Sequence, residues 1–188
     1  MKFLSLLLCI LGLCGCVARQ RDHFYVLDAQ PAAVTESRTQ FDRQITLRVT
    51  VPSLVDRAEM VLTAQSGVTV LDHERWAAPL ADLVTATLGQ DIERRHVNAV
   101  VLQKSEDQAG IPVVRMAIEI DEMTARLGAP VAIETHWRVT DARTGKVSLG
   151  RNYFVSSQRP KDYSELASAL SSCIASLADR LVQEIPAP

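Results

Sequence analysis

The sequence predicts a single α+β domain: a mostly antiparallel mixed β-sheet with two amphipathic helices packed on one face. Two hydrophobic patterns predict this class. Several segments alternate apolar and polar residues with a period of two, which is typical of half-buried strands. Two other segments repeat apolar residues at three- and four-residue steps, which places them on one face of a helix. Two such helices need an apolar surface to cover, and half-buried strands supply one.

The first half of the domain combines short strands with one helix. We expect strands at 23–27, 45–51, 60–63 and 68–71. A tight turn joins the last two, and Gly67 supplies the positive φ that such a turn needs. The first helical stripe opens at Trp76 and runs to residue 92. Because proline is tolerated only in the first turn of a helix, Pro79 places the helix start between residues 74 and 79.

The second half contains longer strands and a closing helix. Strands are expected at 97–102, 111–123, 131–139 and 147–157, the last three as an antiparallel meander with a bulge at Gly150. The final helix has its apolar stripe over 166–185, and Asp162 with Glu165 predicts a reciprocal capping box at its start. Cys173 lies on this stripe, so we interpret it as a small buried hydrophobe. The weakly charged Ala and Ser face of this helix is a candidate contact surface.

The sheet face away from the helices is predicted to be polar. We expect it to meet water or a polar partner, because the strands place on it Arg48, Arg115, Glu119, Glu134, His136 and Arg138. Glu119 and Asp121 share one strand face, which is the geometry of paired acid–base carboxylates. Exposed strands mostly carry such pairs without catalysis, so we interpret this pair as solvated.

Composition and motifs exclude several function classes. The 188-residue chain has 20 Lys and Arg against 22 Asp and Glu, so it has no electrostatic reason to bind nucleic acid. No histidine stands at metal-ligand spacing from another ligand, so we predict neither a metal site nor a cofactor; the four are His23, His73, His96 and His136. The chain has no Gly-x-Ser-x-Gly elbow and no complete phosphate loop. We therefore predict a non-enzymatic protein without catalytic residues.

The first sixteen residues predict export and lipidation. Lys2 precedes an apolar run to Leu13, a secretory signal too short to span a bilayer permanently. The motif Leu13-Cys14-Gly15-Cys16 resembles the bacterial lipobox, in which the cysteine is acylated and the preceding peptide is removed. We expect a signal peptide at 1–15, a lipidated tether at 16–22 and the folded domain at 23–188. Ordinary secretion with cleavage near Ala18 is the alternative.

A further motif resembles a known family. Arg75-Trp76-Ala77-Ala78-Pro79-Leu80, followed by a Leu-rich helix, is similar to the signature of the PqiC-like (YmbA-like) ABC-type transport auxiliary lipoproteins. These accompany Mce (mammalian cell entry) lipid transporters of Gram-negative bacteria. Supporting segments are 24–27, 45–54 and 137–145. The candidate family patch is therefore Arg75, Trp76, Pro79 and Leu80, although Trp76 and Leu80 also suit core residues at a helix start.

The resemblance implies a function and a location. Such proteins are accessory subunits of systems that move lipids between the inner and outer membranes, so the implied partner is an Mce-domain periplasmic subunit. Val17 follows Cys16 where an Asp typically marks inner-membrane retention, which implies an anchor on the periplasmic face of the outer membrane. The ring-forming Mce partners favour a homo-oligomer. A structural envelope lipoprotein without a transport partner and a periplasmic hydrolase are the alternatives.

Overall fold

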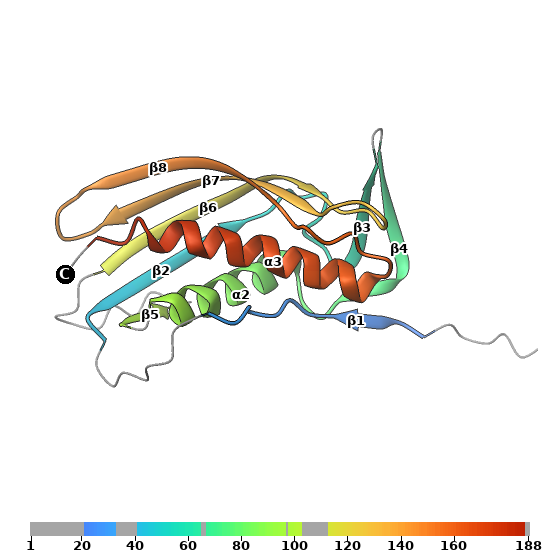
Figure 1. Ribbon diagram of the computed structural model, residues 1–188, viewed down its shortest axis with the longest axis horizontal. Helices are drawn as coiled ribbons and strands as arrows, with labels where there is room; N and C mark the ends of the chain where they lie inside the picture. The colour runs from blue at the N-terminus through green and yellow to red at the C-terminus, as the bar shows by residue number, and fades with distance from the viewer. Residues whose placement is uncertain (1–20, 33–40, 65–66, 97, 103–112, 187–188) are drawn as a thin grey trace, which may run out of the picture.

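The computed structural model describes residues 21–32, 41–64, 67–96, 98–102 and 113–186, and two helices lie along one face of its main sheet (Figure 1). The strands are β1 His23–Tyr25, β2 Arg43–Thr50, β3 Glu59–Ala64, β4 Gly67–Trp76, β5 Ala99–Leu102, β6 Val113–Thr124, β7 Ala132–Asp141 and β8 Val147–Val155. The helices are α2 Leu80–Arg95 and α3 Tyr163–Val182. The predicted α+β class is confirmed.

The main sheet has the strand order β5-β2-β6-β7-β8. Its β6-β7-β8 half is the predicted antiparallel meander, whereas β2 runs parallel to both β5 and β6. The chain between β2 and β5 contains α2, because a parallel pairing needs a long crossover. Alternation sorts the side chains as expected: Ile45, Leu47 and Val49 are buried beneath the helices, and Arg48 is exposed on the other face.

A second, smaller sheet of order β1-β4-β3 stands at one end of the main sheet (Figure 1). Its β3–β4 hairpin is the predicted one, but Gly67 does not have the expected positive φ. It is the first residue of β4 and pairs with Ala64, and residues 65–66 lie outside the described part of the chain. The division of the strands between two sheets is not visible in the alternation pattern.

The predicted start of the first helix is wrong. Trp76 is the last residue of β4, not the first of a helical stripe, and α2 begins at Leu80 after Pro79. The backbone around Trp76 belongs to the small sheet, since Trp76 N donates to Ala58 O at 2.7 Å and Ala77 N donates to Tyr25 O at 2.8 Å. Trp76 and Leu80 enter the same core from a strand and from a helix, which imitates a helical stripe.

Helix α3 begins with a cap that differs from the predicted box by one residue. Asp162 Oδ1 accepts Glu165 N at 2.8 Å, as expected of an N-cap aspartate. The Glu165 carboxylate accepts Lys161 N at 2.8 Å, instead of the Asp162 N–H that a capping box uses. Both backbone N–H groups, that of Glu165 in the first turn and that of Lys161 before the helix, therefore have hydrogen-bond partners.

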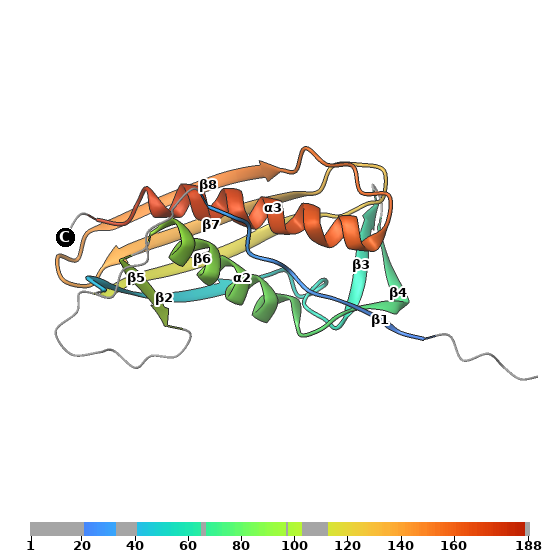
Figure 2. The ribbon, with the colours of Figure 1, turned by 60° about the horizontal axis from the view of Figure 1, so that its bottom comes forward.

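Helix α3 is buried more widely than one stripe requires. It packs against the main sheet and α2, and the segment after β1 crosses both helices (Figure 2). Asp28 N donates to Ser171 Oγ at 3.1 Å, and Thr87 Oγ1 donates to Leu27 O at 3.2 Å. The alanines proposed as a contact face are therefore largely inside; those buried are Ala167, Ala169, Ala175 and Ala178.

Candidate functional site

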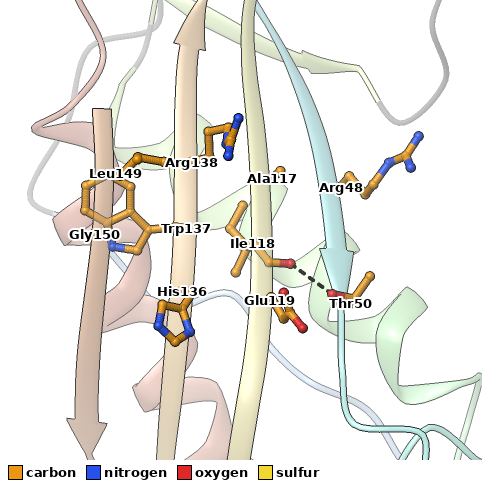
Figure 3. Close-up of a pocket in the computed structure, with 10 residues that line it drawn as sticks. All are labelled: Arg48, Thr50, Ala117, Ile118, Glu119, His136, Trp137, Arg138, Leu149 and Gly150. Carbon is orange, nitrogen blue, oxygen red and sulfur yellow. Dashed lines mark hydrogen bonds between the residues drawn. The ribbon is translucent and has the colours of Figure 1, made fainter. Parts of the chain in front are cut away.

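The sheet face that the helices leave uncovered contains a depression of about 360 Å³ over β2, β6, β7 and β8 (Figure 3). It is lined by Arg48, Thr50, Ala117, Ile118, Glu119, His136, Trp137, Arg138, Leu149 and Gly150. Strand register brings these residues together, because Arg48, Ala117, Arg138 and Leu149 stand opposite one another on four adjacent strands. Ala117 is the smallest of the four, so the surface is lowest between the two arginines.

Three arginines surround Ala117 without carboxylate partners. Arg48 and Arg138 flank it, and Arg115 lies one pleat away on β6. All three are exposed, and within the described residues none of them forms an ion pair. We call Arg48, Arg115 and Arg138 the arginine triangle.

The other end of this face carries several carboxylates, two of which contact basic side chains. Asp121 pairs with His136, and Glu134 pairs with Arg151 at 2.5 Å. The register shifts between Ile120 and Glu122, so a bulge turns both Asp121 and Glu122 outward. Glu119 and Asp121 are both exposed, but the Asp121 carboxylate contacts the His136 ring, so this is a solvated polar network and not a pair of facing carboxylates.

The opposite surface of β7 holds the Trp137 ring over Gly150. The β7–β8 register is continuous through the pair Trp137 and Gly150, so the predicted bulge at Gly150 is wrong. A Cβ at residue 150 would lie 2.1 Å from the ring, which only glycine avoids. Trp137 Nε1 donates to Asn152 Oδ1 at 2.8 Å, and the Arg180 guanidinium lies 5.1 Å from the ring centroid. This packing fixes the floor of the depression from behind.

The predicted family patch does not form one surface. Trp76 and Leu80 are core residues, whereas Pro79 is exposed in the short connection from β4 to α2. Arg75 points the other way and bridges two carboxylates, at 3.3 Å to Glu59 and at 3.2 Å to Asp22. Its ion pairs join β4 to β3 and to the residue just before β1.

Further polar contacts hold β1 against β4. His23 Nδ1 lies 3.1 Å from a Glu74 carboxylate oxygen, and the Tyr25 hydroxyl donates to the other at 2.6 Å. Burial and this bond to Glu74 raise the pKa of Tyr25 to about 12, and the same bond lowers the pKa of Glu74. These contacts, with those of Asp22, hold the chain against the small sheet from residue 22 onward. Cys16 itself lies outside the described residues.

Two further features are absent from the described ranges, namely a group of metal ligands and a membrane-spanning helix. Among those residues, no three His, Cys, Asp or Glu side chains are grouped so that they could hold a metal ion. None of the helices there is long and apolar enough to cross a membrane. The arginine triangle was not singled out from the sequence. Its signal was present only as polar positions on alternating strands, because cross-strand register decides which of them become neighbours.

A protein-family model for the ABC-type transport auxiliary lipoprotein component matches residues 25–182. The chain belongs to this family. The resemblance inferred from Arg75 to Leu80 is thereby confirmed. The family is described as an auxiliary component of transport systems, not as an enzyme. None of the curated proteins compared with the chain matches it.

Solved structures with the same fold are distant in sequence from this auxiliary lipoprotein. One, of an uncharacterized protein, is 16% identical with a TM-score of 0.69, and the match covers 89% of this chain and 100% of the other. Another, of a Xanthomonas campestris protein of the DUF330 family, is 12% identical with a TM-score of 0.60, covering 85% of this chain and 92% of the other. At such identities the likeness shows the fold alone.

Proposed function

We propose that this auxiliary lipoprotein is a non-enzymatic accessory subunit of an Mce-type, ABC-driven system for lipid transport between membranes. Acylated Cys16 holds it on the periplasmic face of the outer membrane, where it docks the transporter and supports envelope integrity. The family match over residues 25–182 carries the proposal, because it names an auxiliary transport component. The lipobox-like Leu13 to Cys16 supplies the anchor.

The structure supports a short, defined reach from that anchor. Six residues, 17–22, separate Cys16 from β1, and a fully extended chain of seven steps spans about 25 Å at most. The contacts of Asp22 and His23 with β4 hold the start of β1 against the small sheet. Several acyl chains on one cysteine hold a protein at a membrane firmly, and a short tether raises its effective concentration there.

The proposed partner is the Mce-domain subunit that crosses the periplasm. A ring-forming partner favours several copies of this chain, so we expect a homo-oligomer at the docking site. Val17 directly after Cys16 supports the outer membrane as the location.

Crosslinking in intact cells tests this function. The full chain, tagged at its C-terminus, is crosslinked, purified from solubilised envelopes and identified with its partners by mass spectrometry. We expect an Mce-domain protein among the crosslinked partners, and its loss when Cys16→Ala removes the anchor. Recovery of envelope proteins without any Mce-domain subunit would contradict the proposal and favour a structural lipoprotein.

A further inference from the structure

The arginine triangle has the charge and spacing of an anion site. Arg48 and Arg138 lie two strand spacings apart, about 10 Å, with Arg115 one pleat, about 7 Å, along the strand between them. Arginine presents several N–H donors in a planar fork that matches phosphate oxygens. Figure 3 shows Arg138 between β7 and β6 and Arg48 extended outward from β2, on either side of Ala117. Both are exposed, so rotation about their side-chain bonds would allow the guanidinium groups to converge over Ala117.

An apolar surface adjoins the triangle. The outward positions of β8, an edge strand, are large hydrophobic residues except for Arg151, which pairs with Glu134; the apolar ones are Val147, Leu149, Tyr153 and Val155. Leu149 is 65% exposed and stands directly opposite Arg138, and Val147 is 47% exposed one pleat away. Exposed apolar residues gathered in a row mark a surface that another molecule covers. The occupant therefore has a negative group and a hydrophobic part beside it.

We propose that this site binds an anionic phospholipid, with its phosphate on the arginine triangle and its hydrocarbon along the outward row of β8. Basic clusters beside apolar surface bind phosphate headgroups in the same way in membrane proteins. A free phosphate would leave the β8 row uncovered, which is why the proposal commits to a lipid. It deepens the proposed transport function by naming the class of molecule that this chain contacts.

One neighbouring charge opposes this ligand. Glu119 lies one pleat from Ala117 on β6, on the same open face, and forms no ion pair with the other described residues. At this distance its carboxylate weakens the attraction of the triangle for an anion. Removing that charge should strengthen binding, an effect that a misfolded variant cannot imitate.

Native mass spectrometry of the full chain in detergent tests the proposal. The chain is mixed with equimolar phosphatidylglycerol and phosphatidylcholine, and in a separate arm with inorganic phosphate. We expect wild type to bind phosphatidylglycerol preferentially, and Arg48→Gln with Arg138→Gln to reduce that preference about tenfold. Glu119→Gln should raise the preference about twofold. Leu149→Ser should weaken phospholipid binding and leave the response to phosphate unchanged.

Arg159→Gln is the matched control. It removes one arginine charge, where the double variant removes two, from the exposed connection between β8 and α3, outside this sheet face, and should leave the preference unchanged. Equal binding of the two phospholipids by wild type, or an equal loss in Arg159→Gln, would overturn the proposal, as would inorganic phosphate binding as tightly as the lipid. The purified chain is used alone, so a failure here is distinct from a failure to capture an Mce-domain partner in cells.

Discussion

At the scale of single residues, Gly150 in β8 has no room for a side chain. A Cβ there would lie 2.1 Å from the Trp137 ring, and the ring is held by Asn152 and Arg180. Gly150→Ala must therefore displace the ring or separate β7 from β8. We expect it to lower the free energy of unfolding by about 2–3 kcal/mol, the cost of overpacking a filled site, measured by urea denaturation.

Gly67→Ala is the control for this substitution. Gly67 has a strand conformation without positive φ, and no atom lies within 4 Å of its added Cβ. Its stability should stay within about 0.5 kcal/mol of wild type. Equal stability of the two variants would show that the Trp137 ring is free to move.

Cys173 should be chemically silent in the folded domain. It is buried, its thiol donates to Val131 O at 3.5 Å, and burial raises its pKa to about 11. The thiolate is the reactive form, so little of it exists at pH 8. We expect a maleimide to label Cys173 only in urea, as read from the mass of its tryptic peptide. Rapid labelling of the folded chain would contradict the burial of this side chain.

At the scale of elements, one buried carboxylate ties the two helices and the N-terminal segment together. Asp91 in α2 is fully buried, and its Oδ1 accepts both Gln30 N and Arg95 Nη1 at 2.9 Å. Arg95 continues to Asp179 in α3 at 2.5 Å. Burial raises the pKa of Asp91, while Arg95 opposes that rise.

Arg95→Met should leave a buried carboxylate without its cation. We expect a loss of about 3 kcal/mol of unfolding free energy at pH 7.5. The pKa of Asp91 is already raised in the folded state and rises further in the variant, so protonation favours the folded form. The deficit should therefore shrink as the pH falls toward 5, measured by denaturation at each pH.

Asp179→Asn is the matched control, because it removes the exposed end of the same network. The Asp179 side chain is 62% exposed, so its pair with Arg95 should contribute less than about 1 kcal/mol. A deficit in Arg95→Met that is independent of pH would show that the lost energy is packing of the arginine stem and not the buried charge.

At the scale of the whole molecule, local patterns predicted the elements better than their pairing. Alternation located β2, β6 and β7, and three- and four-residue steps located both helices, because each pattern reports which side of an element is buried. The small sheet and the parallel pairing of β2 with β5 and β6 depend on partners far along the chain. The sequence pattern assigns Trp76 to the first helix because the end of β4 and the start of α2 bury their side chains in the same core.

For the candidate site too, local patterns predict which side chains are exposed but not which of them are neighbours. The exposure of Arg48, Glu119 and Arg138 follows from alternation alone. Their arrangement around Ala117, and the position of Leu149 beside Arg138, follow from registers that no local pattern encodes. Likewise, the glycine at position 150 indicates a bulge when only the sequence is considered. The structure shows instead that glycine is needed there because the Trp137 ring on the neighbouring strand fills the space of a side chain.

The central claim is that acylated Cys16 holds this domain on the outer membrane. The most direct measurement separates inner membranes, outer membranes and soluble proteins from cells that produce wild type or Cys16→Ala, and locates the chain by immunoblotting. The account predicts wild type in the outer-membrane fraction and Cys16→Ala absent from it. Wild type in the soluble fraction, or both chains distributed alike, would contradict the anchor.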